Sequence, residues 1–194
     1  MDEAEVGTIQ LAGISGSLRR ESYSTAVLLT LKDALTGRAT VNILSPDLPL
    51  YNGDMDGEQR PDAVKNFQSS IASSDGLLIV SPEYNYGIPG VLKNALDWAS
   101  RPANQAALKG KDALIITSSP GMLGGARAQA QIRQTLSATM TRVLVWPDVT
   151  IPRVKDKIVN GRLVDEGTLK IAGEALDALL REIQLRRKMA AQTS

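Results

Sequence analysis

Two short apolar runs constrain the fold of this chain more than any other feature of its sequence. Residues 76–81 place Leu77-Leu78-Ile79-Val80 between turn signals, and residues 112–118 are built in the same way around Ala113-Leu114-Ile115-Ile116. A short, continuous apolar run of this kind is typical of a strand that is covered on both faces, as the strands of a parallel sheet are. The two runs therefore predict a parallel sheet with helices on both sides.

Strand-like and helix-like segments alternate along the whole chain. Strands are expected at residues 8–14, 40–44, 76–81, 112–118 and 143–145, and helices at residues 23–35, from 61 onward, at 89–100, 126–141 and 166–188. This alternation predicts an α/β fold with three layers and a single domain over residues 1–194. Right-handed crossovers place the carboxyl ends of the strands on one edge, where ligands bind. The loops at residues 15–24, 82–88 and 118–125 are the expected site.

The composition excludes several classes of chemistry. The chain has no cysteine and no histidine, which rules out disulfides, thiol nucleophiles, Cys/His zinc sites and Ser-His-Asp or Cys-His triads. We expect no metal site, and we expect a bound cofactor to supply the chemistry. A formal net charge of +1 argues against nucleic acid and membrane partners. Residues 1–6 lack a signal-peptide pattern and no apolar run could span a bilayer, so a cytoplasmic protein is expected.

The first loop is rich in hydroxyl and cationic side chains. It follows a strand and opens a helix, so its backbone N–H groups and the helix dipole favour an anion. It carries the hydroxyl groups of Ser15, Ser17, Ser22 and Ser24. Arg19 can pair with a phosphate monoester. The loop lacks the Walker and GxGxxG patterns, which leaves two interpretations open: a site for a terminal monophosphate, or an ordinary serine-capped turn.

The second loop combines stiffness with aromatic side chains. Residues 81–90 contain two prolines and two glycines, and Tyr84 and Tyr86 are two of only four tyrosines in the chain. Such a loop can build a planar slot for a flavin ring, with backbone partners for the pyrimidine edge of the ring. A structural turn with surface tyrosines is the alternative.

The third loop is rich in glycine. Residues 118–127 contain three glycines, which permit close approach of the backbone to a ligand. Arg127 lies one turn into the following helix, where it either binds ligand or forms an ion pair between subunits. Arg133 and Gln134, further along this helix, are expected at an interface or on the surface.

Three segments on these loops carry a family resemblance. They are residues 16–19 (GSLR), 82–102 (PEYNYGIPGVLKNALDWASRP) and 124–127 (GGAR). In this order they resemble the NADPH-dependent FMN reductase family, and within it they are most similar to the chromate and quinone reductases. The resemblance covers roughly residues 8 to 150.

This resemblance implies a fold, a cofactor and a set of site residues. The fold would be flavodoxin-like, a three-layer sandwich around a five-stranded parallel sheet of order 2-1-3-4-5. FMN would bind non-covalently, with its phosphate on Ser15, Ser17, Arg19, Ser22 and Ser24. The flavin ring would lie on Pro82, Glu83, Tyr84 and Asn85, with Ser118 and Gly121 on its other edge. The family often has Asn at the position of Ser24, so that contact would be weaker here.

The resemblance also implies an oligomer. Family members are dimers or tetramers in which each flavin lies near a subunit boundary, so a homodimer or homotetramer is expected. The helices that begin at residues 89 and 125 would form the interface, with candidate contacts at Tyr86, Arg127 and Asp148. Ala130 stands where some chromate reductases carry a Tyr in a polar network with Arg127 and an acid like Asp148, which makes the tetramer less secure than the dimer.

The implied activity is that of an FMN-dependent NAD(P)H oxidoreductase. In a ping-pong cycle, N5 of the flavin would take a hydride from NADPH or NADH and pass it to a small-molecule acceptor: a quinone, chromate, or another metal or azo compound. No side chain is expected to act as a catalytic acid or base. The alternative is a flavodoxin-like electron carrier that needs a separate reductase, but such carriers tend to be strongly acidic. A response regulator is set aside, because the chain lacks its acidic cluster and phosphoacceptor Asp.

Overall fold

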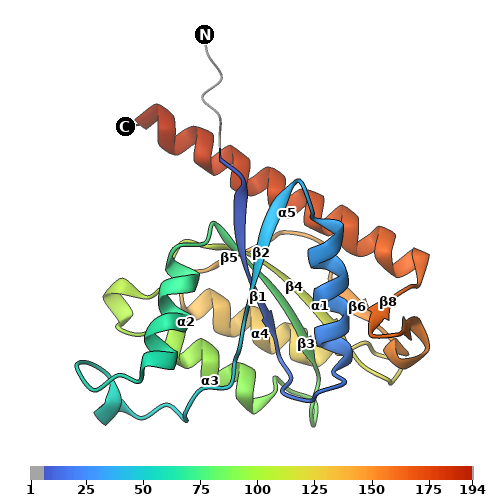
Figure 1. Ribbon diagram of the computed structural model, residues 1–194, viewed down its shortest axis with the longest axis horizontal. Helices are drawn as coiled ribbons and strands as arrows, with labels where there is room; N and C mark the ends of the chain where they lie inside the picture. The colour runs from blue at the N-terminus through green and yellow to red at the C-terminus, as the bar shows by residue number, and fades with distance from the viewer. Residues whose placement is uncertain (1–6, 194) are drawn as a thin grey trace.

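A six-stranded sheet forms the middle layer of the protein, as the computed structural model of residues 7–193 shows (Figure 1). Its strands are β1 (Ile9–Ser15), β2 (Ala39–Leu44), β3 (Gly76–Pro82), β4 (Asp112–Ser118), β5 (Arg142–Val143) and β6 (Val149–Ile151). The helices are α1 (Tyr23–Ala34), α2 (Asp62–Ala72), α3 (Gly90–Ala99), α4 (Ala126–Ala138) and α5 (Glu166–Thr193). Residues 1–6, for which the sequence predicts no signal peptide, lie outside the described residues.

Short elements complete the part of the chain that the structure describes. In it, three 3-10 helices cover Gly53–Met55, Ala103–Gln105 and Val154–Lys157. A hairpin of β7 (Ile158–Val159) and β8 (Arg162–Leu163) forms a separate small sheet. No helix within residues 7–193 has the length and apolar character needed to cross a membrane.

The sheet has the strand order β2-β1-β3-β4-β5, and all of these pairings are parallel. The predicted α/β class and strand order are confirmed. The register places Ile79 of β3 beside Ile14 of β1 and Ile115 of β4. The chain winds outward in both directions from the β1–β3 pair, so the loops after these two strands lie at the point where strand order reverses.

The far edge of the sheet differs from the prediction. The predicted strand at residues 143–145 is wrong, because β5 ends at Val143 and Val145 is 96% exposed. The chain leaves the sheet through Trp146 and Pro147 and returns as β6, which pairs with the last residues of β4. Proline has no N–H to donate to a ladder, so the fifth position is shared by two short strands.

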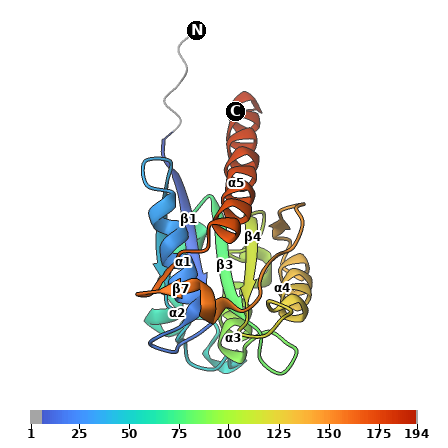
Figure 2. The ribbon, with the colours of Figure 1, turned by 90° about the vertical axis from the view of Figure 1, so that its right-hand side faces the viewer.

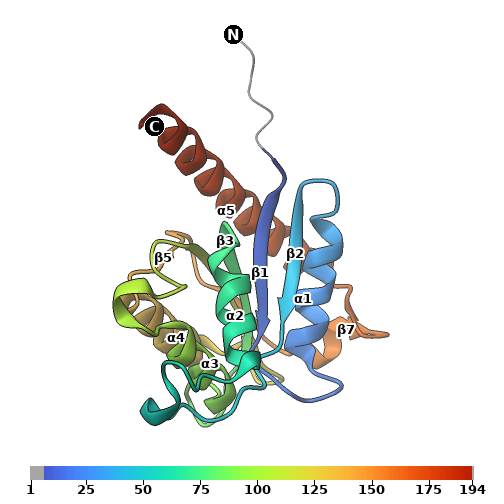
Figure 3. The ribbon, with the colours of Figure 1, turned by 60° about the vertical axis from the view of Figure 1, so that its left-hand side comes forward.

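Helices cover both faces of the sheet (Figures 1 and 3). One hydrophobic core packs α1 and α5 against the side chains of Leu78 and Val80. The other packs α2, α3 and α4 against Leu77 and Ile79, their neighbours in the same strand. Side chains of a strand alternate between its two faces, so the apolar run of β3 supplies both cores.

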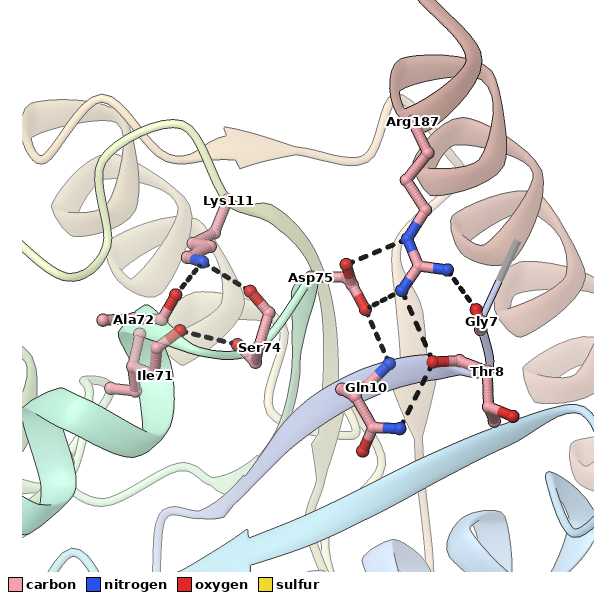
Figure 4. Close-up of polar contacts among 9 residues, drawn as sticks. All are labelled: Gly7, Thr8, Gln10, Ile71, Ala72, Ser74, Asp75, Lys111 and Arg187. Atoms are coloured by element: carbon pink, nitrogen blue, oxygen red, sulfur yellow. Dashed lines mark hydrogen bonds and ion pairs between the residues drawn. The ribbon is translucent and has the colours of Figure 1, made fainter. Parts of the chain in front are cut away.

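Helix α5 is longer than predicted and passes the end of the sheet where the strands begin (Figure 2). Its Arg187 donates to both carboxylate oxygens of Asp75, with Nη2–Oδ2 and Nε–Oδ1 distances of 2.6 and 3.0 Å (Figure 4). The same guanidinium donates to the carbonyl of Gly7. Next to it, buried Asp112 accepts from Arg142 and Arg186. The ion pairs of Arg186 and Arg187 fasten α5 to the amino-terminal edge of the sheet, and we refer to them as the arginine clamp.

Lys111 closes the end of α2 at the same edge (Figure 4). Its ammonium group donates to the carbonyl oxygens of Ala72, at 2.6 Å, and Ser74. A cation at these carbonyls complements the negative end of the helix dipole. Partial burial lowers the pKa of Lys111, although the nearby charge of Asp75 opposes this.

Candidate functional site

The loops that follow β1, β3 and β4 gather at the carboxyl edge of the sheet, at the lower end of the molecule in Figure 1 and opposite the arginine clamp. The loop after β1 lies directly against β3. Gly16 donates its N–H to the carbonyl of Val80 at 2.9 Å. A Cβ on Gly16 would lie 2.3 Å from the Oγ of Ser81, so only glycine fits this crossing.

The hydroxyl groups of the first loop surround the N-terminus of α1. Ser22 is the N-cap, and its Oγ accepts from the N–H of Thr25 at 3.2 Å. Ser15 is hydrogen-bonded to the hydroxyl of Thr25 at 2.8 Å, and the Oγ of Ser17 accepts from the N–H of Arg19 at 3.3 Å. The structure therefore joins Ser15 and Ser22 through Thr25, while Ser17 contacts Arg19 within the same loop. Ser17 and Ser22 act as acceptors in these contacts, so each keeps its O–H to donate to an anion.

Arg19 lies at the rim of this loop. Its guanidinium is 4.7 Å from the ring centroid of Tyr23, the first residue of α1. A cation–π contact of this length holds the charge close to the helix N-terminus. Hydroxyl groups, helix N–H groups and a guanidinium are together the donors that a phosphate monoester requires, so this set fits the phosphate of FMN.

Ser24 and Ser118 connect the first and third loops. The two hydroxyls are hydrogen-bonded at 3.0 Å, and each residue is 1% exposed. The resemblance placed Ser24 at the phosphate and Ser118 at the ring edge, whereas the structure joins them in one buried contact. This contact fixes α1 to the end of β4.

The second loop is a tight turn. Tyr84 and Gly87 exchange both backbone hydrogen bonds, at 3.1 and 3.0 Å. The two residues between them, Asn85 and Tyr86, have φ angles of 50° and 66°. This left-handed conformation costs roughly 1–2 kcal/mol for a bulky residue such as Tyr86. Tyr84 and Tyr86 are 52% and 68% exposed, so both rings are available for contacts outside the chain.

Helix α4 holds the second loop in place. The carboxylate of Glu83 accepts from the N–H groups of Arg127 and Ala128, at 2.9 and 3.1 Å. The N-cap of α4 is Gly125, which has no side chain to cap the helix, so Glu83 caps it from another part of the chain. Its carboxylate is thus committed to α4, and the Oε1 of Gln131 accepts from the N–H of Ile88 at 3.0 Å.

The predicted interface residues fall into two separate groups. The guanidinium of Arg127 lies 4.1 Å from the ring centroid of Tyr86, with Nη1 3.9 Å from the Oε1 of Glu83. Asp148 instead pairs with Arg133 at 2.9 Å. The structure therefore does not join Arg127 to Asp148 within one chain, whereas the polar network that the resemblance implies would connect these two residues.

The third loop lies on β6. Ser119 donates its N–H to the carbonyl of Ile151 at 3.1 Å, and its Oγ accepts from the N–H of Gly121 at 3.0 Å. Gly124 has a φ of 60°, and a Cβ there would lie 2.8 Å from the backbone N of Ile151. The glycines of this loop therefore allow it to pack on β6. The sequence prediction missed both this role and the strand β6 itself, although the run of β-branched residues at 149–151 is a signal for a strand.

A doubly wound parallel sheet with a hydroxyl-rich, cationic turn at its switch point defines the flavodoxin-like class. Comparison with known proteins agrees with this class. Residues 9–156 match the model of the family described as NADPH-dependent FMN reductase. The chain belongs to this family, and it is an enzyme that uses FMN and NAD(P)H.

Individual relatives cover nearly the whole chain. An NAD(P)H-dependent FMN reductase of Pseudomonas aeruginosa is 40% identical over 88% of this chain and 93% of its own length. A quinone reductase of Escherichia coli K12 is 40% identical over 83% of this chain and 88% of its own. A solved structure, the flavoenzyme NAD(P)H:acceptor oxidoreductase FerB of Paracoccus denitrificans, has a TM-score of 0.83 at 34% identity and covers 91% of this chain and 98% of its own.

Proposed function

We propose that this protein is an FMN-dependent NAD(P)H oxidoreductase that reduces quinones. The observation that carries the proposal is the linkage of the three loops, through Ser24–Ser118 and Glu83–α4, into one surface beside a phosphate-type donor set. The names of two relatives support the acceptor class: the E. coli quinone reductase, and a 2-hydroxy-1,4-benzoquinone reductase of a Burkholderia species, 36% identical over 92% of this chain. We extend the proposal to chromate and to other metal or azo compounds as acceptors.

Each loop has a distinct part in this proposal. Ser15, Ser17, Ser22 and Arg19 bind the FMN phosphate, and the buried pair Ser24–Ser118 positions them. The backbone from Pro82 to Asn85 borders the ring on one side, and Gly121 borders it on the other. FMN supplies the hydride-accepting ring, and the protein supplies orientation and backbone donors. One site then serves donor and acceptor in turn, as a ping-pong cycle requires.

The visible spectrum of the purified protein tests this function. Flavin absorption bands that bleach when NADPH is added without oxygen, and return when 1,4-benzoquinone follows, are the expected result. Chromate and an azo dye, offered in place of the quinone, test the wider acceptor range. If the purified protein oxidises NADPH with no partner protein added, it is an enzyme. An electron carrier would need a separate reductase.

We also propose that two copies associate through α3 and α4. A cleft of about 690 Å³ lies between these helices and is bordered by Ile88 and Met140, the latter 54% exposed. The exposed Tyr86–Arg127 pair lies at the start of the same surface. Light scattering of the FMN-loaded protein distinguishes monomer, homodimer and homotetramer.

Two further expectations accompany this proposal. A single domain over residues 1–194 is supported by the two hydrophobic cores, which pack on opposite faces of the same sheet. Limited proteolysis that leaves one resistant fragment tests it. The cytoplasmic location stays a prediction, which cell fractionation tests.

A further inference from the structure

Thr25, in the first turn of α1, connects two of the serines that are predicted to bind the FMN phosphate. Its N–H donates to the Oγ of Ser22 at 3.2 Å, and its hydroxyl is hydrogen-bonded to that of Ser15 at 2.8 Å. Ser15 ends β1 and Ser22 caps α1, so Thr25 joins the last residue of the strand to the first turn of the helix.

The hydroxyl of Thr25 does not take the usual capping role of its position. Thr25 is the third residue of α1, and Ser22 is the N-cap. In a capping box, the side chain at this third position accepts from the N–H of the N-cap residue. Here the N–H of Ser22 donates instead to the carbonyl of Arg19 at 3.1 Å. The Thr25 hydroxyl is directed to Ser15 at the end of β1.

The direction of the hydrogen bond between Thr25 and Ser15 decides what Ser15 can offer an anion. A hydroxyl has one proton to donate, and either oxygen of this pair can be the donor. If Ser15 donated to Thr25, its proton would not be available to the phosphate. If Thr25 donates, Ser15 keeps its O–H for the phosphate, as Ser17 and Ser22 do.

A phosphate monoester favours the second arrangement. Its charge at pH 7 is about −1.5 to −2, and its oxygens accept hydrogen bonds. Ser15, Ser17 and Ser22 are at most 9% exposed, so protein groups rather than bulk water set the direction of their hydroxyls. All three can donate to the anion only when Thr25 donates to Ser15. Successive hydrogen bonds in such a chain also polarise and strengthen one another.

We propose that Thr25 is a positioning residue of the FMN phosphate site: it donates its hydroxyl proton to Ser15, and Ser15 donates its own to a phosphate oxygen. No proton is transferred, because only the directions of the hydrogen bonds are fixed. The inference rests on the proposed function, since it concerns the same phosphate site. It gives Thr25 a part distinct from that of Ser24, whose hydroxyl is paired with Ser118.

A comparison of FMN with riboflavin tests the inference, because riboflavin lacks only the phosphate. The full chain, freed of flavin, is titrated with each ligand by flavin fluorescence, and the ratio of the two dissociation constants isolates the contribution of the phosphate. Thr25→Val keeps the branched shape and removes the hydroxyl. FMN affinity should fall about fivefold, as expected for one hydrogen bond, while riboflavin affinity stays the same. Thr25→Ser keeps the hydroxyl and should keep the ratio.

Thr30→Val is the matched control, because it makes the same substitution further along α1. The hydroxyl of Thr30 accepts from the N–H of Leu163 at 2.9 Å and donates to the carbonyl of Ala26 at 2.9 Å. Its loss should lower the urea concentration at which the protein unfolds and leave the ratio of FMN to riboflavin affinity unchanged.

A double-mutant cycle tests the order of the two hydroxyls. If Thr25 acts through Ser15, Thr25→Val should have no further effect on FMN affinity in the Ser15→Ala background. Additive effects would overturn the inference, and so would an unchanged ratio in Thr25→Val or an equal loss of affinity for both flavins. If the unmodified protein binds riboflavin as tightly as FMN, the phosphate site of the proposed function is itself wrong, which these variants alone would not show.

Discussion

Replacing Glu83 by alanine tests the link between the second loop and α4. The change removes the carboxylate oxygen Oε2, which accepts both capping hydrogen bonds, at 2.9 and 3.1 Å, and belongs to a side chain that is only 12% exposed. Loss of a cap costs about 0.5–2 kcal/mol, and loss of a negative charge at a partly buried helix N-terminus adds to it. Gly125 offers no replacement cap. We therefore expect Glu83→Ala to lower the free energy of unfolding by about 2 kcal/mol.

Glu83→Gln separates charge from hydrogen bonding. The amide keeps one acceptor but loses the interaction with the helix dipole, so we expect a smaller loss, about 0.5–1 kcal/mol. Asp97→Ala is the control, because it removes a partly exposed carboxylate that pairs with Lys93 on α3 at 2.7 Å. Such a pair contributes at most about 0.5 kcal/mol.

Urea unfolding of the apoprotein, followed by circular dichroism, measures these differences. The order of stability should be Asp97→Ala, then Glu83→Gln, then Glu83→Ala as the least stable. FMN affinity should fall in the same order, because a loosened second loop no longer borders the ring. If Glu83→Ala unfolds at the same urea concentration as the unmodified protein, the capping argument is wrong. Reduced stability with unchanged FMN affinity would show that the contact between Glu83 and α4 stabilises the fold without contributing to FMN binding.

Other changes address the remaining parts of the molecule. Arg19→Ala should weaken FMN binding by about 1.5–3 kcal/mol through loss of a charged phosphate contact, and unchanged affinity in a fluorescence titration would exclude Arg19 from the site. Gly87→Val places a Cβ 2.8 Å from the Oε1 of Gln131, so turnover should fall more than stability, and a fully active variant contradicts this. Hydrogen bonds from the side chain and then the backbone of Thr168 lower the pKa of Asp165 from 3.8. The stability this adds is present above about pH 4 and is lost as pH falls through the lowered pKa, so melting temperatures of Asp165→Asn should lack that part of the acid-induced decrease.

The strands and helices near the site could be predicted because local pattern decides them. The apolar run of β3 is buried on both faces, and β4 matches its predicted bounds of Asp112–Ser118. Two short strands, β5 and β6, share the edge of the sheet beside β4. This division depends on how the chain leaves the sheet at Trp146 and Pro147, and the hydrophobic pattern of the sequence does not show it. The hairpin β7–β8 did have a signal: Asn160-Gly161 between two short strands is the usual sequence of a two-residue hairpin turn.

The candidate site was predictable in its loops but not in its contacts. Ser15, Ser17 and Ser22 lie in one strand-to-helix turn, as predicted, and this turn keeps them within a few residues of one helix end. The pairing of Ser24 with Ser118 joins residues 94 positions apart, and the capping of α4 by Glu83 spans 44. Both depend on how the elements pack in three dimensions, and a local sequence pattern carries no information about that.

The arginine clamp has a practical consequence for attachment of the protein. It anchors the last helix at the edge of the sheet that faces away from the three loops, and that helix extends outward from there (Figure 1). A tag or electrode linker fused after Thr193 would therefore orient the molecule with its reactive edge toward the solution. Immobilised protein should keep its access to donor and acceptor. Attachment through Tyr86 of the second loop or Met122 of the third loop, both exposed, would obstruct both.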